Sequence, residues 1–192
     1  MKDIQYIVIG GSAGSFRIVT DILDVLPKNY PYAVILVLHR LKHIKSGFVE
    51  ALTSKSLLPV IEPKDKEKID ISKVYIVPAN YHLYIQPDKT FALSTEEPIN
   101  HSRPSIDITL SSAAFSLKEK MVGVMLSGAN KDGAAGLKRV KESGGYAIVQ
   151  DPEEAMVRTM PEAALLQSKT ENILSSQKII EFLLNLNKRK NV

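Results

Sequence analysis

The chain has 192 residues, of which 44% are hydrophobic and 24% charged, values typical of a single globular domain with its own core. It contains no cysteine, which excludes disulfides, a cysteine nucleophile and a thiolate zinc site. It also contains no apolar run of about 18 residues and no signal-peptide pattern at its start, so we predict a cytoplasmic protein. The net charge of +4 is spread along the chain, so composition does not indicate a nucleic-acid-binding protein.

The first part of the chain predicts a strand, a tight turn, a helix and a second strand. Residues 5–9 form a short β-branched run that ends in the glycine-rich segment of residues 10–14. From Ser15, apolar residues repeat at helical spacing until Pro27 ends them. Residues 32–38 are apolar at every position from Ala33, as expected for a central parallel strand covered on both faces.

The middle of the chain changes its period. Residues 48–58 predict a helix, followed by an exposed connection with two prolines and alternating charges. Residues 74–77, 82–86 and 90–94 then predict three short strands separated by tight turns. We expect these three strands to form a small antiparallel meander.

The last part of the chain returns to alternating helices and strands. We predict a helix from Pro104 to about Lys118, a strand at 122–126, a helix ended by Gly144 and a strand at 146–150. The predicted fold class is α/β: a doubly wound, mainly parallel sheet with a small antiparallel meander extension. Residues 1–192 form one domain in this prediction, with a core at about 4–168 and a C-terminal helix at about 176–188.

Two local clusters of positive charge stand out in the sequence. Their members are Arg40, Lys42, His43 and Lys45 in one, and Lys188, Arg189 and Lys190 in the other. A solvated rim and tail account for them, and a docking surface for an acidic protein partner is the alternative. Nucleic acid is disfavoured, because no aromatic residues alternate with these charges to stack on bases.

Three polar residues follow three predicted parallel strands, where ligands and catalytic groups collect in such sheets. Ser12 follows the first strand, His39 ends the second, and Asp132 lies in the loop after the strand at 122–126. An imidazole can take the proton of a hydroxyl, and a carboxylate can orient the imidazole and stabilise its charged form. The three residues together predict a catalytic triad of a serine hydrolase.

The turn that contains Ser12 has more than one interpretation. Residues 10–14 match G-x-S-x-G, the strand-to-helix turn that presents a nucleophilic serine, and the amides after Ser12 could stabilise an oxyanion. A phosphate or nucleotide loop and a helix cap fit the same residues. The α/β-hydrolase order of serine, acid and histidine is not followed, and the glycine spacing is wrong for a dinucleotide fingerprint.

The remaining histidines and acids have ordinary structural explanations. His43, His82 and His101 are expected to be surface or hydrogen-bonding residues, with no spacing that suggests a metal site. Asp107 lies at a predicted helix start, and Asp151 precedes a proline in a turn. Taken alone, Asp132 would cap the helix that begins near Gly133.

Several ordered motifs together resemble the catalytic domain of the bacterial chemotaxis protein-glutamate methylesterases, the CheB family. The resemblance covers the chain from its first strand to about Gln167. The matching motifs are residues 7–12 (IVIGGS), His39, residues 74–78 (VYIVP), residues 103–107 (RPSID), residues 132–136 (DGAAG), and Met160 with Pro161.

The resemblance implies a serine hydrolase that removes methyl esters from glutamate side chains of chemoreceptors and, in some members, deamidates glutamines. The family's triad maps onto Ser12, His39 and Asp132, and no cofactor or metal is implied. The implied partner is the cytoplasmic region of a methylated chemoreceptor, with no nucleic acid and no membrane insertion. Family members typically carry a receiver domain, so this chain is expected to be either a stand-alone, constitutively open member or an excised domain that could meet a receiver in trans.

The sequence also departs from the family pattern near the site. Ala13, Gly14 and Ser15 replace the usual Thr-Gly-Gly after the nucleophile, and residues 129–131 (ANK) replace Met-Gly-Asn before the acid. Ala13 and Ala129 are therefore the candidate positions for oxyanion or substrate binding. Arg40 and Leu41 replace the usual Met-Pro after the histidine. These departures are the support for an alternative: a non-enzymatic relative that docks to receptors or partners with a degraded pocket.

Overall fold

The computed structural model describes residues 4–39 and 47–188 of the chain. Its strands are β1 (Tyr6–Gly11), β2 (Ala33–Leu38), β3 (Val60–Ile61), β4 (Val74–Ile76), β5 (His82–Ile85), β6 (Phe91–Ser94), β7 (Met121–Met125), β8 (Tyr146–Gln150) and β9 (Ile173–Leu174). Its α-helices are α1 (Phe16–Val25), α2 (Phe48–Ser54), α3 (Ile106–Leu117), α4 (Ala134–Glu142), α5 (Thr159–Ser168) and α6 (Ser176–Lys188), with one turn of 3₁₀-helix at Lys118–Lys120.

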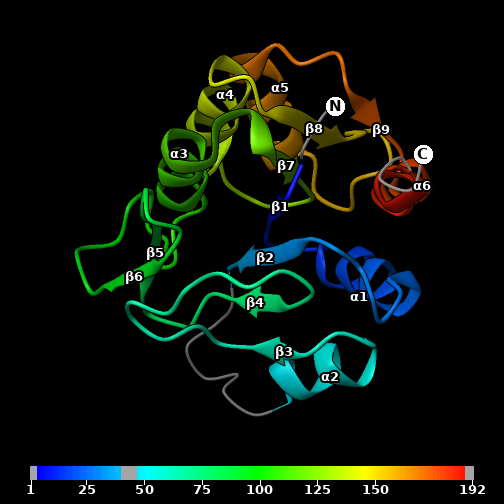
Figure 1. Ribbon diagram of the computed structural model, residues 1–192. Helices are drawn as coiled ribbons and strands as arrows, with labels where there is room; N and C mark the ends of the chain where they lie inside the picture. Colours follow the sequence, from blue (N-terminus) through cyan, green and yellow to red (C-terminus); the bar gives the residue numbers. More distant parts are fainter. Residues whose placement is uncertain (1–3, 40–46, 189–192) are drawn as a thin grey trace.

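Seven parallel strands form the main sheet, in the order β3-β4-β2-β1-β7-β8-β9. The chain leaves β1 through α1 toward β2, but it leaves the neighbouring β7 through α4 toward β8, in the opposite direction across the sheet (Figure 1). The carboxyl ends of β1 and β7 therefore flank a topological switch point, where doubly wound sheets open a crevice. The predicted fold class is confirmed.

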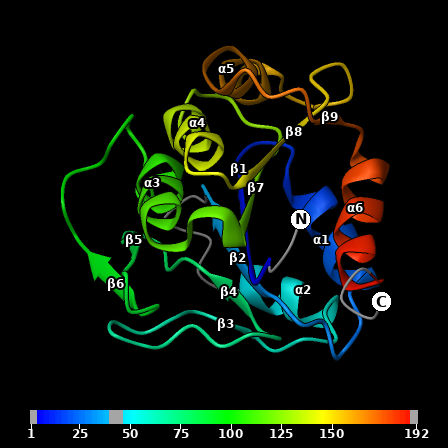
Figure 2. The same ribbon diagram turned by 45° about the horizontal axis from the view of Figure 1, so that its top comes forward.

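Alternate residues of the central strands face two separate hydrophobic layers, because successive side chains of a strand point to opposite faces. Ile7 and Ile9 of β1 pack with α1 and α6 on one face, whereas Val8 packs with α3 and the β5–β6 hairpin on the other. Figures 1 and 2 show α1 and α6 together on one side of the sheet, and α3, α4 and α5 on the other. Both faces being covered explains why β1 and β2 read as continuous apolar runs.

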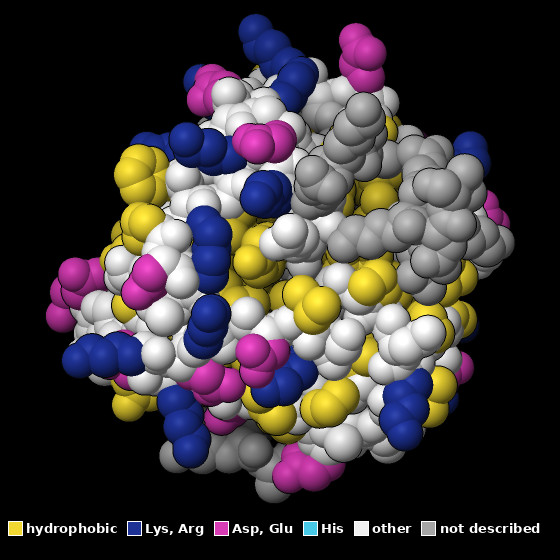
Figure 3. All heavy atoms as spheres, in the orientation of Figure 1, with side chains coloured by type: hydrophobic (Ala, Val, Ile, Leu, Met, Phe, Trp, Pro, Cys, Tyr) yellow, Lys and Arg dark blue, Asp and Glu magenta, His cyan; other side chains and the backbone are white. Residues whose placement is uncertain are grey.

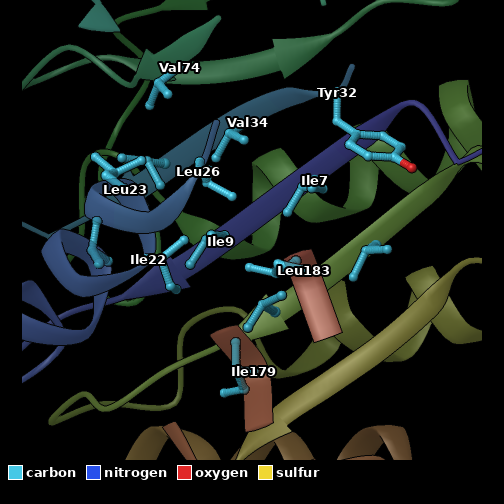
Figure 4. Close-up of a cluster of buried hydrophobic side chains, with 14 of the residues drawn as sticks. Ile7, Ile9, Ile22, Leu23, Leu26, Tyr32, Val34, Val74, Ile179 and Leu183 are labelled. Atoms are coloured by element: carbon cyan, nitrogen blue, oxygen red, sulfur yellow. The ribbon is translucent and has the colours of Figure 1, made fainter. Parts of the chain in front are cut away.

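The first layer is shown at close range in Figure 4. The labelled side chains come from strands, from α1 and α6, and from the positions just after α1 (Leu26) and just before β2 (Tyr32): Ile7, Ile9, Tyr32, Val34, Val74, Ile22, Leu23, Leu26, Ile179 and Leu183. All of these side chains are at most 1% exposed to solvent. This layer packs α1 and α6 against β1, β2 and β4.

The predicted three-stranded meander is corrected by the structure. The first of its strands, β4, pairs in parallel with β2 and β3 and belongs to the main sheet. The other two, β5 and β6, pair antiparallel as a two-stranded hairpin that packs on α3. A three-residue apolar strand has no period that distinguishes parallel from antiparallel pairing, so sequence could not make this distinction.

Some helix boundaries differ from the prediction, and some elements were not predicted. The helix expected over residues 48–58 ends at Ser54, and the two-residue edge strands β3 and β9 and the helix α5 had no specific prediction. The helix predicted from Pro104 begins at Ile106, after Ser105 caps it by accepting a hydrogen bond from the Ile108 amide. Within the described residues, no helix combines the length and apolar character that crossing a bilayer requires.

Helix α6 is fixed to the sheet by two buried tyrosines in addition to its apolar face. The Tyr30 hydroxyl donates to the Leu183 carbonyl at 2.8 Å, and the Tyr32 hydroxyl donates to the Leu186 carbonyl at 2.6 Å. The two rings pack edge to face with centroids 4.9 Å apart. Burial raises the pKa of Tyr30 far above its ordinary value, so this phenol stays protonated and keeps donating.

Replacing Tyr30 by Phe is expected to lower the free energy of unfolding by about 1–2 kcal/mol, because the Leu183 carbonyl loses a buried donor while the ring packing is retained. Urea denaturation at neutral pH measures this loss. Tyr81→Phe, at a half-exposed tyrosine in a turn, is the control and should change stability by less than about 0.5 kcal/mol. Equal stabilities for Tyr30→Phe and the native chain would contradict the anchoring role.

Lysine and arginine side chains intermingle with aspartate and glutamate on the face of the molecule in Figure 3. The two basic clusters predicted from the sequence fall in or beside segments outside the described residues. Residues 40–46 and 189–192 lie outside the described part, and the structure says nothing of the Lys188 side chain.

Candidate active site

The three predicted site residues follow three neighbouring strands at the switch point. Gly11 of β1 pairs with Leu38 of β2, so Ser12 and His39 are the next residues on adjacent strand ends. The His39 amide donates to the Gly11 carbonyl at 3.1 Å. Asp132 comes from the loop after β7, whose Ser127 carbonyl accepts from the Ser12 amide at 2.9 Å. The sheet register therefore places all three residues at the carboxyl edge of the sheet.

Ser12 lies at the start of the turn between β1 and α1 and is half-buried. Its carbonyl accepts hydrogen bonds from both the amide and the hydroxyl of Ser15, which closes the turn. Gly14, not Ser12, has the left-handed backbone conformation (φ +83°), so the strained elbow suggested by G-x-S-x-G does not form at the serine. Within the described residues, the Ser12 hydroxyl has no hydrogen-bond partner.

Close packing accounts for the glycine at the end of β1. A Cβ atom on Gly10 would lie 2.5 Å from the Ile106 Cγ2 atom of α3, closer than atoms can approach. This glycine therefore lets the start of α3 lie directly on β1, which brings the residues around Ile106 to the site. A phosphate loop is not needed to explain it.

His39 and Asp132 are in direct contact: the His39 Nε2 atom lies 2.8 Å from Asp132 Oδ2. The Asp132 side chain is fully buried, and the His39 side chain is 13% exposed. An ionised carboxylate only accepts hydrogen bonds, so Nε2 carries the proton in the neutral ring and Nδ1 keeps a lone pair. The Nδ1 atom is thus the nitrogen able to accept a proton.

Four donors surround the Asp132 carboxylate. Besides His39, these are the Ser105 hydroxyl at 2.8 Å, the Ile106 amide at 2.6 Å and the Asp107 amide at 3.2 Å. Burial alone would raise the pKa of Asp132, but the hydrogen bonds from His39, Ile106 and Ser105 outweigh it and hold the pKa below its usual value. Asp132 therefore stays ionised while buried and caps α3, not α4 as its sequence position suggested.

Asp107 caps the other helix in return. Its carboxylate accepts from the Gly136 amide in the first turn of α4 at 2.7 Å and from the Asn100 side chain at 3.3 Å. Burial raises the pKa of Asp107, and the nearby charge of Asp132 adds to that rise. The loop before α4 and the first turn of α3 are thus linked by two carboxylates that each cap the opposite helix.

Replacing Asp132 by Asn should lower the free energy of unfolding at pH 7 by about 2–4 kcal/mol, because an amide cannot accept from all four donors. The lowered pKa of Asp132 means that its carboxylate stabilises the fold above the unfolded-state value, near pH 4, and that this stabilisation is lost as pH falls through the folded-state value. The difference in free energy of unfolding between the native chain and Asp132→Asn should therefore become smaller below about pH 4. Denaturant titrations from pH 7 to pH 3 measure it.

Asp70→Asn is the matched control for this pH series. Asp70 is exposed, and among the described residues its side chain pairs with Lys73, so its removal should cost less than about 1 kcal/mol at pH 7. A difference between Asp132→Asn and the native chain that stayed constant from pH 7 to pH 3 would contradict the assignment of an ionised, hydrogen-bonded Asp132.

A family model described as CheB methylesterase matches residues 7–183, which is most of the chain. The chain belongs to the CheB methylesterase family. It is 40% identical over 182 residues to a putative protein-glutamate methylesterase/protein-glutamine glutaminase of Leptospira interrogans, and the match covers 95% of this chain and 94% of that protein. A Thermotoga maritima protein-glutamate methylesterase/protein-glutamine glutaminase is 35% identical, and the match covers 95% of this chain and 54% of that protein.

The fold is also similar to the crystal structure of the Thermotoga maritima CheB methylesterase catalytic domain. The TM-score is 0.89 at 35% identity, and the match covers 96% of this chain and 99% of that one. The chain thus spans nearly all of the Leptospira protein and about half of the Thermotoga protein. The CheB fold therefore agrees with the resemblance that the sequence motifs indicated.

Several residues of this CheB-type site were not predicted as functional. Ser105 binds Asp132 directly, and the buried His82 supports Ser105 by accepting its amide hydrogen at 3.1 Å. Ser102 contacts His39 on the other side of the ring from Asp132, and Asn130 bonds both to Ser102 and to the Asp132 amide. Ser105 belongs to the RPSID motif that marked the family, so its presence there was a usable signal; Ser102 carried none.

The candidate oxyanion positions are exposed. Ala13 and Ala129 are both exposed, and within the described residues neither amide has a hydrogen-bond acceptor. The Ala13 carbonyl is held by the Ser127 hydroxyl at 2.7 Å, which fixes the orientation of the peptide group after Ala13. The departures at Arg40 and Leu41 lie outside the described residues.

The other polar residues have the hydrogen-bonding roles expected of them, where the structure describes them. His82 is buried between Ser105 and the Glu97 carbonyl, and His101 is exposed in a turn. The Asp151 side chain accepts from the Glu153 amide in its own turn. His43 lies outside the described residues. Within the described part of the chain, no group of three or more acids and histidines is placed to hold a metal ion.

Proposed function

We propose that this chain is a carboxylic ester hydrolase that demethylates glutamate methyl esters on the cytoplasmic region of chemoreceptors. The observation that carries the proposal is the buried His39–Asp132 hydrogen bond of 2.8 Å, placed one strand from an accessible serine at the switch point. Ser12, His39 and Asp132 are the proposed nucleophile, base and supporting carboxylate. The names of the relatives support the same reaction class.

The proposed acylation step uses both His39 nitrogens. His39 Nδ1 removes the proton of Ser12, whose oxygen attacks the ester carbonyl to form a tetrahedral intermediate. Asp132 stabilises the imidazolium through Nε2–H. When the C–O bond to the methoxy group breaks, Nδ1 returns the proton and methanol leaves. In the serine protease triad the two ring nitrogens have the opposite roles, but the proton balance is the same.

The deacylation step repeats this sequence with water. His39 Nδ1 takes a proton from water, the hydroxide attacks the acyl-enzyme carbonyl, and the Ser12 oxygen leaves with the proton. The amides of Ala13 and Ala129 are the proposed oxyanion donors in both steps, because each lies close in sequence to a triad residue and has no acceptor among the described residues. A backbone donor does not depend on the side chain, so alanine at these positions is compatible with the chemistry.

The same machinery applies to a glutamine side chain, from which ammonia leaves in place of methanol. Two relatives carry the name of protein-glutamine glutaminase as well as methylesterase. A receiver domain, in a longer protein or acting in trans, is a proposed regulatory partner. The reaction needs no cofactor, since the triad supplies the nucleophile, the base and the acid.

The test is methanol release from a methylated receptor fragment, with ammonia release from the glutamine form measured in parallel. The native chain is expected to release methanol, with matching loss of the methyl group from the fragment by mass spectrometry. No methanol from several methylated fragments would overturn the proposal and favour the alternative of a non-enzymatic docking relative. Ammonia without methanol would instead make the protein a glutaminase.

A further inference from the structure

Ser102 is the residue in contact with the free nitrogen of His39. Its hydroxyl oxygen lies 3.4 Å from His39 Nδ1, on the opposite side of the ring from Asp132. The residue is 8% exposed, too buried to present its hydroxyl to a substrate freely. A tight turn places it: Ile99 and Ser102 exchange both backbone hydrogen bonds, at 3.2 and 2.8 Å, across two residues of left-handed conformation.

Asn130 orients the Ser102 hydroxyl. The Asn130 side-chain oxygen accepts from the Asp132 amide at 3.1 Å, which turns the Asn130 NH₂ group toward Ser102. That NH₂ group donates to the Ser102 oxygen at 3.2 Å. One oxygen lone pair of Ser102 is therefore used by Asn130, and its single hydrogen remains available for another acceptor.

That hydrogen has two acceptors at the same distance. His39 Nδ1 and the Asn100 carbonyl oxygen each lie 3.4 Å from the Ser102 oxygen. When His39 is neutral, Nδ1 has a lone pair and the hydroxyl can donate to it. When Nδ1 has taken a proton, the hydroxyl can donate to Asn100 and accept from Nδ1–H with its second lone pair. A hydroxyl rotates freely, so Ser102 can bond to His39 in either charge state.

We propose that Ser102, oriented by Asn130, is a positioning residue that holds the His39 ring in its catalytic orientation before and after proton transfer. The inference rests on the proposed function, because it assigns Nδ1 as the base. Asp132 alone holds the ring at one point, about which the ring can tilt; Ser102 supplies a second point on the opposite nitrogen. The contact of 3.4 Å is weak enough for the Ser12 hydroxyl to displace it on Nδ1 during attack.

Replacing Ser102 by Ala is expected to lower kcat for methanol release roughly 10- to 100-fold and to change KM less than about twofold, because ring orientation and not substrate binding is lost. Ser102→Thr keeps the hydroxyl and should restore most of kcat. His101→Asn, in the same turn, is the control, because asparagine tolerates the left-handed backbone there and His101 is exposed. A Ser102→Ala chain with native or higher kcat would overturn the proposal.

Asn130→Ala tests the second part of the arrangement. If Asn130 acts through Ser102, the variant that combines Ser102→Ala with Asn130→Ala should have about the same kcat as Ser102→Ala alone. Losses that multiply in the double variant would overturn the claim that Asn130 acts through Ser102.

A spectroscopic readout separates this inference from the proposed function. In NMR spectra of histidine-labelled protein, the His39 ring should give one set of signals in the native and Ser102→Thr chains. It should give broadened or doubled signals in Ser102→Ala. This result is expected even if no receptor fragment is demethylated, whereas unchanged His39 signals in Ser102→Ala would overturn the positioning role whatever the activity.

Discussion

Replacing Ser12 by Ala should lower kcat for methanol release by about 10⁵–10⁶-fold. Without the hydroxyl, no acyl-enzyme can form, and only the oxyanion donors and substrate binding remain to assist water. Initial rates on a methylated receptor fragment at matched enzyme concentration measure the loss. Ser54→Ala, at an exposed serine near the end of α2, is the control and should keep native activity.

The structure contains a rival serine, which makes this experiment decisive. The Ser102 hydroxyl oxygen lies 3.4 Å from His39 Nδ1, yet Ser102 is buried and already accepts from Asn130. A fluorophosphonate that labels activated serines should therefore attach to the Ser12 peptide, as located by mass spectrometry. An active Ser12→Ala chain, or a label on Ser102, would refute the proposed nucleophile.

His39→Ala should reduce kcat by a similar factor of about 10⁵–10⁶, because the base and its nucleophile act as one unit. The fold should survive this substitution. Asp132 retains its hydrogen bonds from Ser105, Ile106 and Asp107, so the buried carboxylate is not left unpaired. Unfolding free energies of the native and His39→Ala chains should agree within about 2 kcal/mol.

Two further measurements make the role of His39 specific. Added imidazole should restore part of the rate in His39→Ala, since the cavity left by the ring lies beside both Asp132 and the Ser12 turn. The double variant with Ser12→Ala should be no slower than either single variant, as expected for residues of one proton-transfer unit. A His39→Ala chain that turned over at the native rate would eliminate histidine as the base.

His39 and Asp132 could be predicted to lie together because parallel strands end at one edge of a sheet, whatever the distance between them in sequence. The register that places Ser12 beside His39 follows from β1 and β2 being neighbours joined by one helix. The reciprocal capping by Asp107 and Asp132 was not foreseen. From the sequence, each aspartate was placed at the start of the helix nearest to it. In the structure Asp132 accepts from the first amides of α3, and Asp107 accepts from an amide in the first turn of α4.

The role of Ser102 was not predicted from the sequence for a different reason. A serine in a loop has no periodicity, and its contact with His39 spans 63 positions of sequence. The same holds for Asn130, which was noted only as a departure before the acid. The short strands were missed or wrongly paired in the prediction for a related reason. Each of β3, β4 and β9 has two or three residues, too few to reveal a period or a pairing direction.

The sequence by itself determined the fold class, the covered central strands, the family and the three polar residues that follow neighbouring strands. These follow from local patterns: continuous apolar runs, glycine and proline punctuation, and polar residues directly after strands. Only the tertiary structure decided which nitrogen of His39 faces Asp132, which helix each aspartate caps, and that Ser102 and Asn130 complete the surroundings of the ring. Hydrogen bonds between residues from different loops depend on distances and angles that packing sets, and local sequence does not encode them.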